Sequence, residues 1–130
     1  MNATDGINRV LSNATELASR GEFSKALGVL EPLAVSEPND PRVLGVLAGV
    51  YFRQDRFEEA ARYFRRATER SPRSELASLG LFHALWKLGE QLSAEQELTR
   101  FLSIRESEEY RMLLEEMGWR FEGAMLIKPA

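Results

Sequence analysis

Residues 41–74, PRVLGVLAGVYFRQDRFEEAARYFRRATERSPRS, decide the fold of this chain. Two kinds of apolar residue recur in this stretch at helical spacing. The small ones, which let paired helices approach closely, are Ala48, Ala60 and Ala67. The large ones, which fill the space between helices, are Leu44, Leu47, Tyr51 and Phe64. The stretch predicts two packed helices that bury their apolar faces only against a neighbouring pair.

The same pattern returns at one fixed offset on either side of this stretch. The offset that places Pro38 on Pro72 also aligns four other pairs of apolar residues. These pairs are Ala14 with Ala48, Leu17 with Tyr51, Ala26 with Ala60, and Leu30 with Phe64. One more step brings in Leu85, Ala94 and Leu98. A fixed period of this length indicates an array of stacked repeats.

The pattern resembles the tetratricopeptide repeat, which runs large, Leu, small, aromatic, Ala, aromatic, Ala, Pro over 34 positions. Residues 41–74 match it at Leu44, Leu47, Ala48, Tyr51, Ala60, Phe64, Ala67 and Pro72. Residues 7–40 and 75–108 match it less closely. They depart at Asn13, Leu33, Ser78, Phe82, Phe101 and Glu106. The resemblance implies an all-α, right-handed superhelical solenoid of three helix-turn-helix repeats within a single domain, residues 1–130.

Helix boundary signals support this division. Asp40 before Pro41 predicts a capped helix start. The stretch 55–58 reads as a capping box for the next helix. Gly21 and Gly89 lie where a first helix should stop and turn into the second. Pro32 falls inside an expected helix, where we predict a kink or an early end.

Beyond the third repeat, residues 108–117 place Tyr110, Leu113, Leu114 and Met117 on one helical face and acidic residues on the other. This pattern predicts a capping helix that closes the apolar end of the array. Residues 118–130 form an apolar tail that should pack on a surface, either of this chain or of a neighbour.

The residue inventory offers no catalytic arrangement. There are no cysteines, and the single histidine, His83, has no partners that would make it a base or one of a set of metal ligands. Gly45 and Gly49 are spaced within a helix rather than clustered in a phosphate-binding turn. We therefore predict no enzyme activity, no catalytic residues, no metal and no cofactor.

The amino-acid composition limits the classes of binding partner that we expect. With 20 acidic and 17 basic side chains, the net charge of −3 gives no case for nucleic acid or an anionic membrane surface. The sequence shows neither a secretory signal nor an apolar run of membrane-spanning length, so we expect a cytoplasmic protein.

The family resemblance also implies a binding groove, lined by the first helix of each repeat. The groove positions that we expect to contact a ligand are Leu11, Thr15, Arg42, Gly45, Gly49, Phe52, Arg53, Leu79, His83, Trp86 and Lys87. Other groove positions hold Asn8, Ala18, Ser19 and Leu76. Either close packing or room for a ligand explains the two glycines. Phe52 and Trp86 with nearby basic residues suit a peptide that carries apolar anchors and acidic character. The alternative is that both rings belong to the core.

Some relatives clamp an acidic carboxyl-terminal tail with lysine and asparagine at set groove positions. This chain has Leu11, Thr15, Val46, Leu76 and Gly80 there, which argues against a co-chaperone of that kind.

Two function classes remain from the sequence. The first is an adaptor or scaffold that binds a protein or peptide in the groove. The second is a structural module that self-associates as a homo-oligomer, with the groove or end surface of one copy filled by the tail, residues 119–130, of its neighbour. Uneven charge supports it, because seven arginines face four acids over residues 53–73, whereas nine acids face four arginines over 90–122. An ordinary surface of ion pairs is the simpler interpretation of this asymmetry. A third possibility is a small chaperone that holds secretion substrates. Proteins of that kind are similar to this chain in size and class, although no motif in the sequence points to this function.

Overall fold

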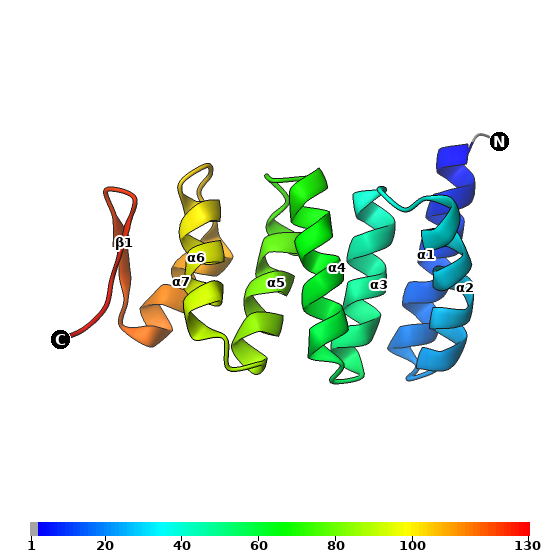
Figure 1. Ribbon diagram of the computed structural model, residues 1–130, viewed down its shortest axis with the longest axis horizontal. Coiled ribbons are helices and arrows are strands. Elements are labelled where there is room, and N and C mark those ends of the chain that lie inside the picture. The colour runs from blue at the N-terminus through cyan, green and yellow to red at the C-terminus, as the bar shows by residue number, and fades with distance from the viewer. Residues whose placement is uncertain (1–2) are drawn as a thin grey trace.

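The computed structural model describes residues 3–130, and this part of the chain forms seven helices and a short antiparallel hairpin. The elements are α1 (Ala3–Ser19), α2 (Phe23–Ser36), α3 (Pro41–Arg53), α4 (Phe57–Arg70), α5 (Glu75–Lys87), α6 (Gln91–Leu102), α7 (Glu108–Met117), β1 (Arg120–Glu122) and β2 (Met125–Ile127). The helices stand side by side in chain order, with the termini at opposite ends (Figure 1). The predicted all-α solenoid is confirmed, and the hairpin is a feature that the sequence analysis did not predict.

Each repeat supplies one pair of helices: α1 with α2, α3 with α4, and α5 with α6. The first helices also contact one another, α1 with α3 and α3 with α5. Alanines fill the closest approaches, as their small size requires, and are fully buried. These alanines are Ala14, Ala26, Ala48, Ala60 and Ala94.

The turn inside each repeat is built in the same way. Gly21, Asp55 and Gly89 occupy the same position in successive repeats and have φ angles of 78°, 59° and 77°. In each case the next backbone N–H closes a bond to a carbonyl five residues back, at 2.9–3.0 Å. In this type of helix ending, the residue after the helix adopts the left-handed backbone conformation, and glycine is the usual residue there.

The predicted capping box at residues 55–58 is therefore wrong. Asp55 ends α3 instead of starting α4, and Arg56, the residue before α4, makes no side-chain capping bond. Arg56 instead pairs with Glu59, with 2.7 Å between the guanidinium nitrogen and the carboxylate oxygen. At Asp40 the expectation holds, since its carboxylate accepts a bond from the Arg42 backbone N–H at 2.9 Å.

Pro32 does not shorten its helix. α2 continues through it to Ser36 and has the same length, 14 residues, as α4. The buried side chains of Ala26, Leu27 and Leu30 anchor this helix before the proline. Packing outweighs the local cost of the missing backbone bond.

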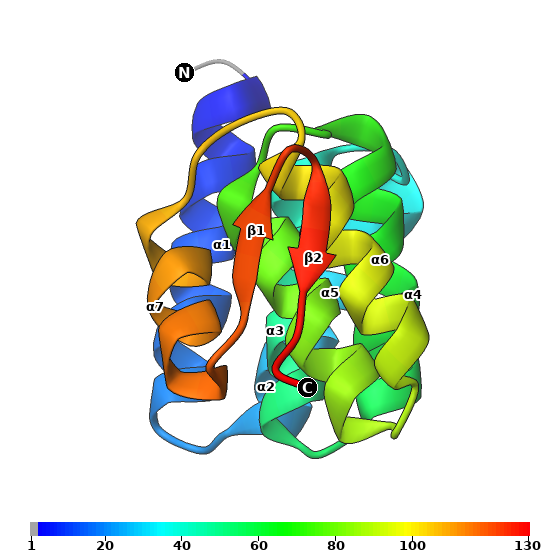
Figure 2. The same ribbon diagram turned by 90° about the vertical axis from the view of Figure 1, so that its left-hand side faces the viewer.

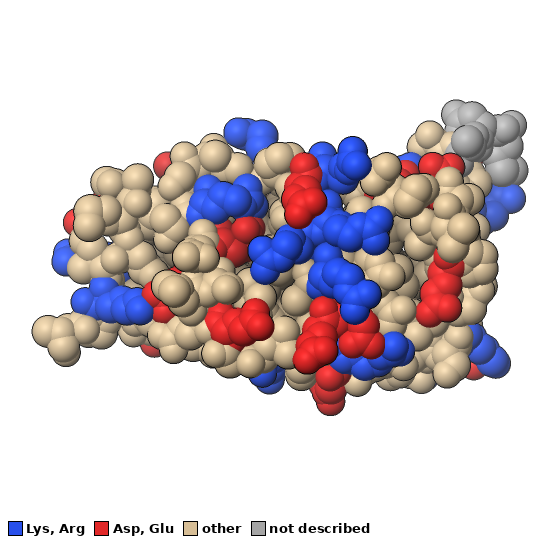
Figure 3. All heavy atoms as spheres, in the orientation of Figure 1, with Lys and Arg blue, Asp and Glu red and all other residues tan. Residues whose placement is uncertain are grey.

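Arginines link the second helices of the second and third repeats, α4 and α6, to the connection before their repeat. Arg66 on α4 donates to the Pro38 carbonyl at 2.7 Å, and Arg100 on α6 donates to the Pro72 carbonyl at 3.0 Å. The two donors occupy equivalent repeat positions, and so do the two acceptors. Basic side chains gather over α4 on the face shown in Figure 3, with acidic side chains around them. Part of the arginine-rich stretch is thus structural.

Replacing Arg66 with methionine should lower the free energy of unfolding by about 1 kcal/mol, because a charge-assisted bond between repeats is lost while the apolar stem is kept. Urea denaturation measures this change. Arg65→Met is the matched control, since its side chain makes no hydrogen bond among the described residues. An equal loss in both variants would contradict an arginine link.

The third repeat departs from the pattern where it meets α7. Tyr110 of α7 is fully buried, and its ring centroid lies 5.8 Å from that of Phe82 and 5.7 Å from that of Phe101. Ser78 leaves room for the Tyr110 hydroxyl, 2.8 Å away. Three of the four residues that departed from the repeat pattern in the third repeat therefore form the seat of the capping helix.

A chain of polar groups runs through this seat. The Ser78 hydroxyl donates to Glu97 at 2.7 Å, and Glu97 is also paired with Arg100 at 2.6 Å. Since the single Ser78 proton goes to the carboxylate, the Tyr110 hydroxyl donates to Ser78. Burial raises the pKa of Tyr110, so this proton stays in place. Every member of the chain is satisfied, as a buried polar network requires.

The last residues fold as a hairpin across the end of the solenoid (Figure 2). Gly123 and Ala124, with φ angles of 56° and 62°, form its turn. Trp119, Phe121 and Leu126 pack partly buried against the core. Lys128 lies 2.6 Å from Glu95. The apolar tail thus packs on its own chain.

Candidate functional site

The residues predicted to line a groove lie on the layer of first helices, α1, α3 and α5. They differ widely in what they expose. Leu11 is buried in the core, and Leu79 is half-buried against it. Thr15 is at the surface and donates to the Leu11 carbonyl at 2.9 Å, while Arg53 and Lys87 are exposed. The outer faces of these helices, and not every predicted position, remain available to a ligand.

Arg42 is held in place by two acceptors. It pairs with Asp40 at 2.6 Å and donates to the side-chain oxygen of Asn8, its counterpart in the first repeat, at 2.9 Å. The hydrogen bond from Arg42 lowers the pKa of Asp40 below its usual value. Arg42 therefore cross-links α1 and α3, and Asp40 offsets its charge.

The two groove glycines leave open space. A Cβ atom at Gly45 or Gly49 would meet nothing within 4 Å, so close packing does not explain either residue. Gly80 on α5 is the opposite case, because a Cβ there would lie 2.4 Å from the Phe64 ring. Of the two explanations for Gly45 and Gly49, room on the surface is the one that fits.

A pocket of about 380 Å³ opens beside Gly45, between α3, the end of α4 and the start of α5. We call it the α3–α5 pocket; its lining is Pro41, Arg42, Gly45, Val46, Ala67, Ser71, Ser74, Leu76 and Ala77. Most of these side chains are apolar, and Leu76 is 79% exposed. An exposed leucine at the rim of an apolar pocket is suited to contact a partner's apolar side chain.

The rings of Phe52 and Trp86 contact different aromatic neighbours. Phe52 is half-buried against the core and meets Phe57 edge-on, with 5.1 Å between the ring centroids. Trp86 is 36% exposed, stacks on Phe82 at 5.7 Å and meets Trp119 of the carboxyl-terminal segment at 6.2 Å. Each ring is partly core and partly surface, which combines the two interpretations of the sequence.

His83 lies at the surface, edge-on to Phe82 with 5.5 Å between ring centroids. Partial burial, and secondly the charge of Lys87, lower the pKa of His83, so its ring is neutral at pH 7. Among residues 3–130, no group of three or more histidine, aspartate or glutamate side chains is arranged to hold a metal ion. None of the helices in this range is long and apolar enough to cross a membrane.

Sequence reasoning missed part of the pocket. Ser71 and Ser74 come from the connection between repeats, which the groove positions do not include. Leu76 was a groove position, and it lies exposed in the first turn of α5. The signal that was available is a leucine two residues after the N-cap Ser74.

Comparisons with known proteins agree with this architecture. No curated protein matches the sequence. The solved structures that resemble it include the N-terminal domain of stress-induced protein-1 (STI-1) from C. elegans, with 22% identity, a TM-score of 0.74, and coverage of 89% of this chain and 98% of that one. The first TPR of Spaghetti (RPAP3) bound to the HSP90 peptide SRMEEVD shows 18% identity, a TM-score of 0.72, and coverage of 82% and 88%.

The type III secretion translocator chaperone SycD from Yersinia enterocolitica is similar at 18% identity, with a TM-score of 0.71 and coverage of 88% of this chain and 89% of that one. These likenesses describe the fold. Two sequence models of the tetratricopeptide repeat match residues 11–75 and 51–117, and together they reach from the middle of α1 to the end of α7. This chain belongs to the tetratricopeptide repeat family.

Proposed function

We propose that this chain is an adaptor that binds a segment of a partner protein along its first helices, with the α3–α5 pocket as the anchor point. The observation that supports this most directly is the pocket itself. It combines an open position at Gly45 with a leucine, Leu76, that is 79% exposed. A partner side chain that fills such a pocket would bury apolar surface from both proteins.

The pocket chemistry favours an apolar anchor over an acidic tail. Asp40 offsets the charge of Arg42, the cation in the lining. The clamp positions hold Val46, Leu76 and Gly80 in place of lysine and asparagine. The acidic HSP90 peptide that the Spaghetti domain binds is therefore a poor guide to this chain's ligand.

The alternative of assembly through the carboxyl-terminal tail has less support. Trp119 contacts Trp86, and Lys128 contacts Glu95, within the same chain. The tail is therefore packed without a second copy of the chain. Light scattering before and after deletion of residues 119–130 tests this alternative. A mass that falls by half on deletion would favour it.

The adaptor proposal is tested by filling the pocket. Gly45→Leu should lower the affinity for a captured partner by about tenfold or more, because the new side chain occupies the anchor space. Gly49→Leu is the matched control, since Gly49 has the same open surroundings but lies outside the pocket lining. Partners captured by affinity purification are compared between the variants, and circular dichroism checks the helices. Equal capture by both variants would contradict the α3–α5 pocket as the site.

A further inference from the structure

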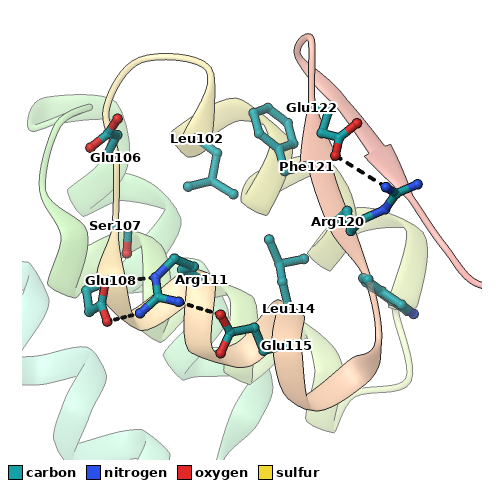
Figure 4. A pocket seen from close by; sticks show the side chains of 11 residues that line it. Leu102, Glu106, Ser107, Glu108, Arg111, Leu114, Glu115, Arg120, Phe121 and Glu122 are labelled. Carbon is teal, nitrogen blue, oxygen red and sulfur yellow. Dashed lines mark hydrogen bonds and ion pairs between the residues drawn. The ribbon is translucent and has the colours of Figure 1, made fainter.

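A second and larger hollow, of about 830 Å³, lies at the carboxyl-terminal end of the solenoid between α7 and β1. Leu102, Leu114 and Phe121 line its apolar part, and Glu106, Glu115 and Glu122 stand at its rim (Figure 4). We call it the α7–β1 hollow. The two short strands after α7 leave it open on one side.

One edge of the hollow is an unpaired strand edge. Among residues 3–130, β1 pairs with β2 alone, in the register Arg120 with Ile127, Phe121 with Leu126, and Glu122 with Met125. The two-residue turn makes Glu122 and Met125 a hydrogen-bonded pair. Because hydrogen-bonded and non-bonded pairs alternate, the N–H and C=O of Phe121 point away from β2, toward the free edge. Such an edge is a template for another strand.

The rim of the hollow is acidic. Its lining holds four carboxylates, Glu106, Glu108, Glu115 and Glu122, and two guanidinium groups, Arg111 and Arg120. Arg111 pairs with both Glu108 and Glu115. Arg120 meets Glu122 at 3.4 Å, a long contact between exposed groups. No described residue forms an ion pair with Glu106. The four carboxylates and two guanidinium groups leave the rim with a net charge of −2.

We propose that the α7–β1 hollow binds an extended, basic segment of a partner protein, which adds as a third strand to β1. The backbone of that segment would pair with Phe121, an apolar side chain would enter the space between Leu102 and Leu114, and lysine or arginine side chains would meet Glu106 and Glu122. A helix offers no free backbone groups to a strand edge, so an extended segment fits this edge better. This surface is separate from the α3–α5 pocket and does not depend on it.

The probe for this proposal is a fluorescent, end-capped peptide of alternating lysine and valine, about eight residues long. Fluorescence anisotropy measures its binding to the full chain. The same peptide with N-methyl groups on alternate residues keeps the charge but loses the backbone donors of one edge. We expect binding of the first peptide and about tenfold weaker binding of the second. Equal binding of both, or no binding of the first, would overturn strand addition.

A pair of charge-matched variants locates the site. Glu106→Lys with Glu122→Lys should weaken binding by about tenfold. Glu109→Lys with Glu116→Lys changes the net charge by the same amount outside the lining of the hollow, and should change binding by less than about twofold. Equal losses would mean that general attraction to an acidic protein explains the binding, and would overturn the site.

Two further measurements distinguish this site from the α3–α5 pocket, and a partner segment from a second copy of the chain. Gly45→Leu should leave peptide binding unchanged, so failure of the groove proposal and failure of this one are distinguishable. Light scattering of the unliganded chain should show a monomer at the concentrations used. A dimer that the peptide does not dissociate would assign the free edge of β1 to a second copy, and the proposal would be wrong.

Discussion

Replacement of Tyr110 by alanine is expected to cost about 3–5 kcal/mol of unfolding free energy, the range for deletion of a large buried aromatic side chain. Tyr110 is fully buried and meets the rings of Phe82 and Phe101. Its loss would leave a cavity under α7 and open the end of the solenoid. Urea denaturation followed by circular dichroism measures the change.

The variant Tyr110→Phe separates ring from hydroxyl. It keeps the packing and removes only the bond to Ser78, so we expect a smaller loss of about 1 kcal/mol. If both variants lost the same free energy, the polar chain from Tyr110 to Glu97, and not the aromatic packing, would hold the cap. A loss below about 1 kcal/mol for Tyr110→Ala would contradict the cap's role in stability.

The second large effect is expected at Gly80. A Cβ atom there would lie 2.4 Å from the ring of Phe64, which is itself 6% exposed and has little room to move. Gly80→Val should therefore destabilise the chain by about 3 kcal/mol, since overpacking forces the helices α4 and α5 apart. Thermal or urea denaturation measures the loss.

Gly49 supplies the matched control for this prediction. Gly49→Ala adds a methyl group to a helix where nothing lies within 4 Å, so its helix propensity should raise stability by about 0.5–1 kcal/mol. The same change at Gly80 gives the same gain in helix propensity but also a clash with Phe64. The clash outweighs the gain, so Gly80→Ala should lower stability by about 1 kcal/mol. The same sign in both variants would contradict the close approach of α4 and α5 at Gly80.

The helix pairs could be predicted because their signals repeat. A fixed period places the same small and large residues in each pair, so an error at one position is outweighed by its counterparts. Asp55 is a position at which the repeat alignment was not applied. It occupies the position of Gly21 and Gly89, and that alignment would have identified a left-handed turn in place of a capping box.

The end of the chain was harder to predict, because there the contacts are not periodic. Ser78, Phe82 and Phe101 looked like drift from the repeat, yet they fit the ring and the hydroxyl of Tyr110. The strands of the hairpin have three residues each, too few for an alternating pattern. Trp119 meets Trp86 although the whole of α6 and α7 separates the two rings in the sequence.

The placement of the expected groove residues on the first helices could be predicted, but their contacts could not. Periodicity could assign Gly45 and Arg42 to the exposed side of α3. It could not show that Arg42 is bound by Asp40 and Asn8, since side-chain hydrogen bonds depend on geometry between helices. The shape of the α3–α5 pocket depends likewise on the connection between repeats.

The arginine links have a consequence for how such a chain can grow. Residues 41–74 contain both a donor, Arg66, which reaches the preceding repeat, and an acceptor, the Pro72 carbonyl, which receives Arg100 of the following one. This repeat thus supplies the donor of the hydrogen bond to the preceding repeat and the acceptor of the bond from the following one. A gene duplication that copied residues 41–74 in tandem would supply a complete donor and acceptor at every new boundary, with no compensating substitution elsewhere.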